Sequence, residues 1–358
     1  MGKGIVIITG CSGRIGTRAI ERFSKEYQVV GFDLVPPKGN YENFHFIKMD
    51  LSNEENIAQG FKQVKEKFGD HVVSMVHLAA YYNFTGGHQD LYDKITVRGS
   101  ERMLHHLQEF KCEQFIFSST QLLMAPCKVG EKINEDSPVD ANWDYPISKI
   151  KTEKIIHSKR GNIPAVILRI VGCYDDECHS IPISNQIQRI YEQQFQSKVF
   201  PGDLKAGAPF MHLADLTDAI ALTVEKRKDL PPDLTLLIGE GKTLSMDQLQ
   251  KLISLHCHGK EMTTIRIPKI VAKIGAWLQW KLPGMPETFI RPWMIDIADN
   301  NWTLDISRAK KYLGWEPKHD VEKMIPKMIE DLKKDPIKWY QINNLKVPSW
   351  LSKKFGKK

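Results

Sequence analysis

The sequence has little cysteine and lacks any apolar run long enough to cross a membrane. Its six cysteines are scattered through 358 residues, and a chain of this length has enough core to fold without disulfides, so we expect a reducing compartment. A membrane-spanning helix needs about 20 consecutive apolar residues, and no apolar run in the sequence reaches that length. The sequence opens directly on the apolar segment GIVIITG, which leaves no room for a secretory signal. We therefore predict a cytoplasmic protein.

Concentrated charge of one sign is also scarce over most of the chain. The net charge is +7, and the last thirteen residues contain five lysines and no acidic residue, so the remainder is nearly neutral. A nucleic-acid surface needs lysine and arginine clustered on the folded body, and we therefore expect a small-molecule substrate and no nucleic-acid partner. Residues 346–358 form a basic tail, which we interpret as a solvated terminus, with contact to anionic lipid or RNA as the alternative.

What the sequence does contain is a regular alternation of strand-like and helical segments from residue 4 to about residue 170. The composition, with 42% apolar and 26% charged residues, is that of an ordinary globular protein. Strands that are apolar on both faces and separated by helices predict a parallel sheet covered on both sides. The expected fold class is α/β, a doubly wound parallel (Rossmann) sheet that occupies residues 1–170.

After Arg169, loops rich in proline and glycine interrupt this alternation. They indicate a smaller, mostly helical C-terminal lobe over residues 171–335, which we predict to bind the substrate. The lobe is expected to be discontinuous, since residues 211–239 contain a helical pattern and a strand pattern that suit the main sheet. Further helices are expected near 184–196, at Ser245, where Gln248 completes a capping box, near Pro268, at Ile306 and at Val321.

A glycine-rich segment, TGCSGRIG, directly follows the first predicted strand and opens a helix. In this context Gly10 permits a tight turn, Gly13 lets a pyrophosphate approach the backbone, and Gly16 allows close helix packing. The helix N-terminus, which includes Arg14 and Ile15, offers unpaired amides to the anion. Residues 1–170 are therefore predicted to be a dinucleotide-binding domain.

An aspartate at the end of the second strand indicates which dinucleotide is bound. Asp33 lies twenty-three residues after Gly10, where a carboxylate can accept both hydroxyls of the adenosine ribose and repel the 2′-phosphate of NADP. NAD is favoured, although Arg14 and Lys38 could serve a 2′-phosphate. The residues that end the third and fourth strands are expected to contact the cofactor as well, or simply to cap those strands: Asp50, Leu51, Leu78, Ala79 and Ala80.

The segment YPISK places Tyr145 and Lys149 four residues apart, on one face of a predicted helix. An ammonium group beside a phenol favours the phenolate and lowers the pKa of the tyrosine toward neutral pH, as proton transfer requires. Twenty-five residues upstream, the strand FIFSST ends on Thr120, at the sheet edge where ligands bind. These three residues are the predicted catalytic groups.

With these motifs the sequence resembles the extended short-chain dehydrogenase/reductase family, also called the NAD-dependent epimerase/dehydratase family. TGxxGxxG, the acidic end of strand two, LAA, SST and YxxxK occur in family order, and LRIVGCY, FMHLADLTDAI and LDISRAKKYLGWEP extend the likeness over residues 3–330. The resemblance implies that Thr120 hydrogen-bonds the reacting oxygen, that Tyr145 is the acid/base, and that Lys149 holds the nicotinamide ribose and lowers the tyrosine pKa. It also implies a homodimer.

The sequence departs from this family at positions that carry substrate chemistry. Dehydratases follow the catalytic Thr with Asp and Glu, whereas Thr120 is followed by Gln121 and Leu122, which cannot transfer protons, so 4,6-dehydration is not expected. The Asn and Arg with which nucleotide-sugar epimerases bind the diphosphate are replaced by Gly172 and Ala208. Arg291 could restore the lost charge. Thr96 replaces a family Asn that supports the active site.

The predicted lobe is rich in large apolar side chains: Trp277, Trp280, Phe289, Trp293 and Trp302. Residues 267–278 form an apolar helical stripe flanked by Lys269 and Lys273. We interpret the stripe as a helix packed on the core, with an apolar substrate pocket or a membrane-surface helix as the alternatives. His256, Cys257 and His258 cannot converge on one ion from a regular helix, and no metal site is predicted.

The first functional hypothesis is an NAD-dependent dehydrogenase or reductase that acts on a secondary alcohol or its ketone, as a 3β-hydroxysteroid dehydrogenase does. The alternative is a nucleotide-sugar 4-epimerase, which the replacements at Gly172 and Ala208 disfavour. A non-catalytic NAD-sensing regulator is the hypothesis of another class, and the retained Tyr145 and Lys149 argue against it.

Overall fold

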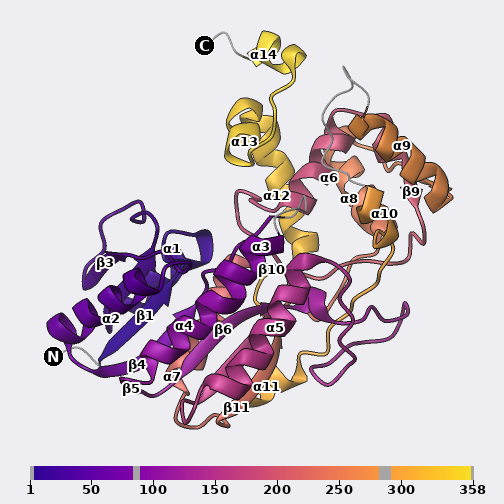
Figure 1. Ribbon diagram of the computed structural model, residues 1–358. Helices are drawn as coiled ribbons and strands as arrows, with labels where there is room; N and C mark the ends of the chain where they lie inside the picture. Colours follow the sequence, from indigo (N-terminus) through magenta and orange to yellow (C-terminus); the bar gives the residue numbers. More distant parts are fainter. Residues whose placement is uncertain (1–3, 84–88, 282–291, 356–358) are drawn as a thin grey trace.

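A parallel sheet lies at the centre of the N-terminal part (Figure 1). The computed structural model describes residues 4–83, 89–281 and 292–355. The strands of the sheet are β1 (Ile5–Thr9), β2 (Gln28–Asp33), β3 (Phe44–Lys48), β4 (His71–His77), β5 (Lys111–Cys112), β6 (Phe115–Thr120), β7 (Ala165–Ile170) and β11 (Asp233–Ile238). They lie in the order β11-β7-β6-β4-β1-β2-β3, with β5 paired to β4.

The strand order reverses between β1 and β4. From β1 the chain first builds β2 and β3 on one side, then crosses to β4 and continues outward through β6 and β7 to β11. At such a reversal the loops after the two neighbouring strands diverge and leave a crevice for a ligand. The doubly wound parallel sheet predicted from the sequence is therefore confirmed, and the segment near 211–239 contributes its outermost strand β11.

Successive residues of the strands supply two separate cores. Ile5 and Ile7 of β1 point to the face that is covered by α2 (Glu54–Phe68), α4 (Arg98–Leu107) and α5 (Asp144–Lys159). Val6 and Ile8 point to the opposite face, covered by α1 (Arg14–Phe23), α7 (Leu213–Glu225) and α11 (Ser307–Leu313). Because strand side chains alternate between faces, an apolar strand of this kind is buried on both sides.

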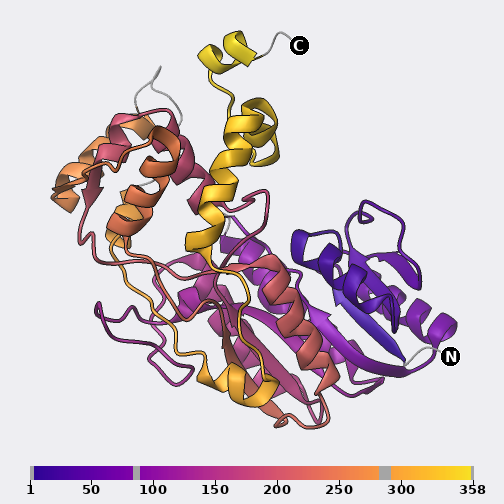
Figure 2. The ribbon, with the colours of Figure 1, turned by 180° about the vertical axis from the view of Figure 1, so that it is seen from behind.

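The helices of the C-terminal lobe lie together beside the main sheet (Figure 2), and buried side chains from several of them form a separate core. Its helices are α6 (Ile181–Tyr191), α8 (Met246–His258), α9 (Lys269–Lys281), α10 (Pro292–Asp296), α12 (Val321–Lys334), α13 (Pro336–Ile342) and α14 (Ser349–Phe355). The predicted capping box is present at Ser245. Two short parallel pairs complete the lobe: β8 (Gly172–Tyr174) with β10 (Phe210–His212), and β9 (Val199–Pro201) with β12 (Ile265–Ile267).

Short helical segments connect these elements. Between β4 and α4 lie α3 (Gln89–Leu91) and a π-helical turn over Tyr92–Val97, and 3-10 turns follow β6 (Gln121–Leu123) and α6 (Phe195–Lys198). None of the helices in the described part of the chain has both the length and the apolar character needed to span a bilayer.

The interpretation of residues 267–278 as a helix packed on the core is wrong. Ile270, Ile274 and Trp277 on α9 are each more than half exposed. The helix is held instead by its charged side, because Lys269 and Lys273 form ion pairs with Asp299 and Asp296. These pairs turn the lysines toward the lobe and leave the apolar stripe outside. Trp302 lies in the core of the main sheet rather than in the lobe.

The interpretation of residues 346–358 as a solvated terminus is also wrong for the described part of that segment. Residues Ser349–Phe355 form α14, and Leu351 is completely buried in the lobe core. Trp350 packs near Tyr191 of α6. The lysines at 353 and 354 stay exposed, so the segment is anchored by its apolar side chains. Lys357 and Lys358, like Phe289 and Arg291, lie outside the described residues.

Candidate functional site

The glycine loop joins β1 to α1 with the geometry that a dinucleotide needs. Gly10 has φ +68°, and a β-carbon on it would lie 2.9 Å from the Ala79 nitrogen. A β-carbon on Gly16 would lie 2.2 Å from the Gly10 oxygen, so the helix packs directly on the loop. Gly13 caps α1 and faces open space, where a β-carbon would meet only the Gly10 oxygen, at 3.3 Å. The loop therefore fits a pyrophosphate at the helix N-terminus.

One cavity beside this loop collects the residues predicted to contact adenosine. It has a volume of about 430 Å³, and its lining includes Gly10, Gly13, Asp33, Asp50, Leu51, Leu78, Ala79 and Ala80. The Asp33 carboxylate accepts hydrogen bonds from the backbone nitrogens of Ser12, at 2.9 Å, and Leu34, at 2.7 Å. Asp33 therefore holds the glycine loop in place while its charge faces the cavity.

A neighbouring cavity of about 530 Å³ lies on the other side of the glycine loop. Its lining includes Arg14, Ile15 and Gly16 together with Thr120 and Tyr145, while Gly10, Gly13 and Leu78 line both cavities. The two cavities thus share the glycine loop, one on the side of Asp33 and the other on the side of Tyr145. An extended dinucleotide laid across the loop would reach from the first to the second.

Arg14 belongs to the cavity of Tyr145 rather than to that of Asp33. Its guanidinium lies 3.8 Å from the carboxylate of Asp175, which follows β8. Burial raises the pKa of Asp175, but the hydrogen bond to His179, at 2.7 Å, and the charges of His179 and Arg14 together leave that pKa below its usual value. Lys38 is exposed. Among the described residues, neither Arg14 nor Lys38 forms an ion pair with Asp33, beside which the 2′-phosphate of NADP would lie.

The phenol of Tyr145 and the hydroxyl of Thr120 meet at the end of β6. Thr120 Oγ1 accepts a hydrogen bond from the Leu122 nitrogen, at 3.2 Å, which leaves its proton free to donate. The pKa of Tyr145 differs from the lowered value expected from the sequence. Burial raises this pKa, and the nearby Tyr82 raises it further. The hydrogen bond with Thr120 acts in the opposite direction. The lowered tyrosine pKa expected from the sequence is therefore not found.

Lys149 lies one helical turn beyond Tyr145 and is buried against the sheet. Its Nζ donates a hydrogen bond of 2.7 Å to the Ser118 carbonyl oxygen and lies 5.8 Å from the centre of the Tyr145 ring. Burial lowers the pKa of Lys149 to about 7, although the charge of Glu153 opposes this. Burial against the sheet is thus the main influence on whether Lys149 is protonated.

Aromatic side chains surround Tyr145, and sequence reasoning did not identify them. The ring of Tyr82 meets Tyr145 edge-on at 5.0 Å, and Trp143 lies 5.6 Å from it. Trp143 in turn lies 5.1 Å from Trp293 of α10, which connects the tyrosine to the lobe. Trp143 stands two residues before the YxxxK motif, but no local pattern indicates its partner 150 residues later.

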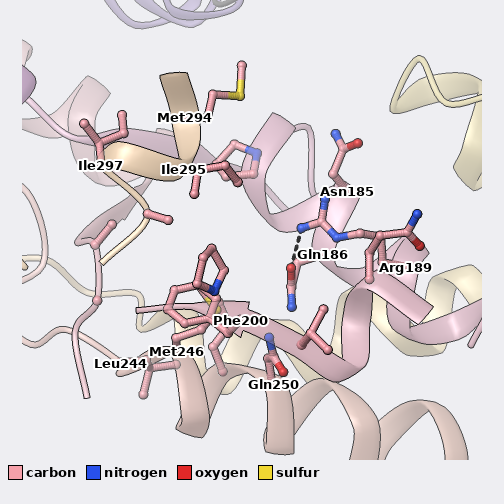
Figure 3. A pocket seen from close by; sticks show the side chains of 18 of the residues that line it. Asn185, Gln186, Arg189, Phe200, Leu244, Met246, Gln250, Met294, Ile295 and Ile297 are labelled. Atoms are coloured by element: carbon pink, nitrogen blue, oxygen red, sulfur yellow. Dashed lines mark hydrogen bonds between the residues drawn. The ribbon is translucent and has the colours of Figure 1, made fainter. Parts of the chain in front are cut away.

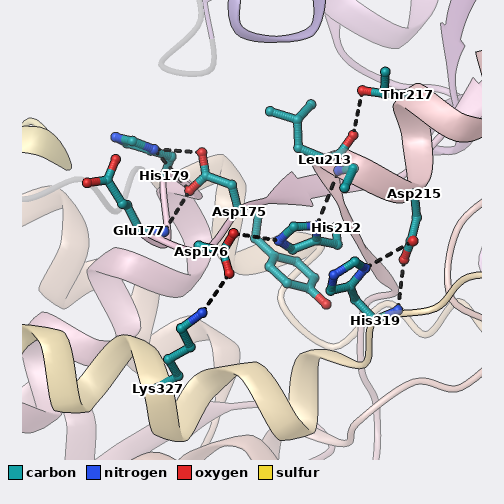
Figure 4. A network of polar contacts seen from close by, with 12 residues as sticks. Asp175, Asp176, Glu177, His179, His212, Leu213, Asp215, Thr217, His319 and Lys327 are labelled. Atoms are coloured by element: carbon teal, nitrogen blue, oxygen red, sulfur yellow. Dashed lines mark hydrogen bonds and ion pairs between the residues drawn. The ribbon is translucent and has the colours of Figure 1, made fainter. Parts of the chain in front are cut away.

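A polar network adjoins the same cavity (Figure 4). The rings of His212 and His319 stack with their centres 3.9 Å apart, and His319 hydrogen-bonds to Asp215. These two contacts join β10 and α7 to the segment before α12. Asp176 bonds to Lys327 of α12. The contacts of His212 and Asp176 hold the lobe against the main sheet.

The positions at which the sequence departs from the resembled family have distinct surroundings. Gln121 is buried where a dehydratase would present an acid. Thr96 lies in the π-helical turn and accepts a hydrogen bond from the Tyr81 nitrogen. Gly172 lines the cavity of Tyr145, whereas Ala208 lines a separate cavity in the lobe.

His77 is buried, and its pKa falls to about 3 through burial and the nearby Lys149 charge.

Comparison with known proteins gives matches over most of the chain. Residues 6–239 match the family model described as NAD dependent epimerase/dehydratase family. The 3-beta-hydroxysteroid dehydrogenase of Mycolicibacterium neoaurum is 20% identical, covering 88% of this chain and 87% of the relative. The uncharacterized UDP-glucose epimerase YtcB of Bacillus subtilis is 24% identical, covering 87% of this chain and 92% of the relative.

A solved structure has the same fold. The UDP-glucuronic acid 4-epimerase from Bacillus cereus, in complex with NAD, superimposes with a TM-score of 0.68 at 18% identity, covering 92% of this chain and 99% of the epimerase. The relatives therefore include both a steroid dehydrogenase and sugar-nucleotide epimerases.

Proposed function

This chain belongs to the NAD-dependent epimerase/dehydratase family, and from that premise we propose that it binds NAD and oxidises a secondary alcohol, or reduces the corresponding ketone. The observation that carries the proposal is that Thr120 and Tyr145 line one cavity with the glycine loop. Asp33, on the other side of that loop, supports NAD over NADP because its carboxylate would repel a 2′-phosphate.

In the proposed mechanism each residue has a separate task. The Thr120 hydroxyl accepts a hydrogen bond from the Leu122 amide and donates its own proton in a hydrogen bond to the reacting oxygen. Tyr145 receives the hydroxyl proton as the alcohol becomes a ketone, and returns a proton in the reverse direction. NAD, when bound, supplies the acceptor for the hydride that leaves the same carbon.

Lys149 acts by position and charge. Its hydrogen bond to Ser118 keeps the ammonium behind the Tyr145 ring. A protonated Lys149 favours the phenolate form of the tyrosine, and so acts against the rise in the tyrosine pKa that burial and Tyr82 cause. Proton transfer at Tyr145 is therefore expected to depend on the protonation of the lysine.

The substrate that we propose is an alcohol with an apolar body. The Tyr145 cavity is bordered by Ile15, Leu122 and Leu213, and Gly172 stands where the resembled epimerases have a polar anchor. The likeness to the steroid dehydrogenase supports the same choice. A nucleotide-sugar 4-epimerase is the second candidate, which the likeness to the UDP-glucose epimerase and to the UDP-glucuronic acid 4-epimerase favours.

Incubation of the purified protein with NAD and three substrate classes separates these functions. Hydroxysteroids and simple secondary alcohols should produce NADH absorbance, whereas UDP-hexoses that interconvert without net NADH would establish the epimerase instead. Tyr145→Phe should reduce turnover by about 10²–10⁴-fold and retain NAD binding, with Tyr312→Phe on α11 as the matched control. A non-catalytic sensor would be indicated if Tyr145→Phe changed no activity while loss of Asp33 abolished it.

A further inference from the structure

A separate cavity of about 300 Å³ lies inside the C-terminal lobe, between α6, α8 and α10 (Figure 3). Most of its wall is apolar, and includes Phe200, Leu244, Met246, Met294 and Ile295. The polar groups gather on one side, where α6 contributes Asn185, Gln186 and Arg189 and α8 contributes Gln250. The cavity therefore has an apolar part and a polar end.

Arg189 is the only charged side chain among the described residues that line this cavity. Its guanidinium donates to the amide oxygen of Gln186, which is a neutral partner. Burial lowers its pKa to about 10, and no carboxylate among the described residues offsets that effect. A guanidinium in apolar surroundings is normally paired with an anion, because burying an unpaired charge is costly.

Gln186 provides an independent sign that a ligand belongs here. Its side chain is only 6% exposed, and its Nε2 has no hydrogen-bond partner within the described part of the structure. A buried donor that is left unpaired costs about 1–3 kcal/mol. The amide of Gln186 and the guanidinium of Arg189 share one hydrogen bond and leave the remaining donors available at the same end of the cavity.

We propose that Arg189 and Gln186 bind the carboxylate of the substrate, and that the apolar wall receives its hydrocarbon body. A planar carboxylate accepts two parallel hydrogen bonds from a guanidinium, and the free amide of Gln186 supplies another donor. The proposal rests on the proposed function, and it narrows the substrate to an apolar alcohol or ketone that carries a carboxylate away from the reacting carbon.

The charge of the cavity distinguishes a carboxylate from a nucleotide diphosphate. One guanidinium balances a single negative charge, whereas a diphosphate carries at least two. Ala208, at the position where the resembled epimerases have an arginine, lines this same cavity and supplies no charge. The rest of the wall is mostly apolar, so it suits a hydrocarbon better than a sugar.

Two contacts connect this cavity to Tyr145. Phe210 lines the lobe cavity and pairs in β10 with Gly172, which lines the cavity of Tyr145. Trp293 precedes Met294 and Ile295 on α10 and stacks near Trp143, the neighbour of Tyr145. One substrate molecule can therefore be expected to extend from Tyr145 into the lobe.

The test is isothermal titration calorimetry of the full-length, NAD-saturated Tyr145→Phe protein, so that binding is measured without turnover. The probes are decanoate, methyl decanoate and UDP. Decanoate should bind at least tenfold more tightly than its methyl ester. Arg189→Gln should weaken decanoate at least tenfold and leave the ester unchanged, and Gln186→Leu should weaken decanoate to a smaller extent.

Lys251→Gln removes a positive charge from α8 outside the cavity lining and should leave decanoate binding unchanged. Thermal unfolding of each variant identifies any that fail to fold. The comparison of decanoate with methyl decanoate uses a protein in which Arg189 and Gln186 are unchanged, so it does not depend on those variants. Equal binding of acid and ester, or binding of UDP with none of decanoate, would overturn the proposal. Failure of the proposed function would appear separately, as an absence of NADH formation in the wild type.

Discussion

Nζ of Lys149 donates a hydrogen bond of 2.7 Å to the backbone carbonyl oxygen of Ser118. This contact joins α5, which carries Tyr145, to β6, which ends on Thr120 two residues after Ser118. The predicted catalytic groups are therefore positioned by one strand and the helix packed on it. Their relative placement is set by the main sheet and the helix packed on it.

The buried Lys149 predicts a specific pH dependence of stability. In the unfolded chain this lysine keeps its proton up to about 10.5, whereas in the folded protein its pKa is about 7. The unfolded state thus binds more protons between these values, so the stability of the wild type relative to Lys149→Met should rise with pH, by at most about 1.4 kcal/mol per pH unit. Urea unfolding of both proteins between pH 6 and 9.5 measures this difference. A difference that stays constant would contradict the burial of a titrating lysine.

The charge of Asp33 predicts cofactor choice. Asp33→Ala removes both the carboxylate and its bond to the Ser12 nitrogen, so NAD binding should weaken by roughly tenfold or more and the preference for NAD over NADP should fall. Asp33→Asn keeps an acceptor for the loop but removes the charge, and it should shift the preference with a smaller loss of NAD affinity. Fluorescence titration with both cofactors measures this, and an unchanged preference in both variants would disprove the role of Asp33.

Close packing at Gly16 predicts that a single methyl group will disturb the loop. The added β-carbon would lie 2.2 Å from the Gly10 oxygen, so Gly16→Ala must displace backbone and should destabilise the protein by about 1–3 kcal/mol. NAD binding should weaken as well. Gly275→Ala on α9 is the matched control, because its β-carbon would meet no atom within 4 Å in the described structure. Thermal unfolding with and without NAD compares the two, and equal effects would argue against the tight loop.

A buried ion pair behind the site gives a fourth prediction. Glu153 of α5 binds Arg169 of β7 at 2.8 Å, and its carboxylate also accepts from the Ser119 hydroxyl. Glu153→Gln should cost about 3–5 kcal/mol, because it leaves a buried guanidinium without its counter-charge. The double variant Glu153→Gln/Arg169→Met should recover most of this loss. Denaturant unfolding tests the pair, and a double variant as unstable as the single one would show that the charge itself is not responsible.

Much of the cofactor site could be predicted because its determinants are local in the sequence. Gly10, Gly13 and Gly16 lie on one loop, and Asp33 ends the next strand, where parallel topology returns it to the same edge of the sheet. The pair Tyr145 and Lys149 is likewise set by helix periodicity. These inferences need only the order of strands and helices.

The direction of α9 could not be predicted in the same way. Its apolar stripe suggested a helix facing the core, but periodicity only states which residues share a face. Ion pairs of Lys269 and Lys273 with Asp299 and Asp296 turned that face outward. The raised pKa of Tyr145 was missed for a related reason, since it comes from burial in the folded protein and from Tyr82, which is distant in sequence.

By itself the sequence determined the parallel sheet, the glycine loop and the order of the catalytic motifs, because each depends on short-range spacing and on the alternation of strands and helices. Only the tertiary structure decided that Arg14 faces Asp175, that Trp143 meets Trp293, and that Arg189 and Gln186 lie together at the polar end of a lobe cavity. The physical reason is that charge pairing, burial and cavity shape arise from contacts between segments as much as 203 residues apart, which no local pattern encodes.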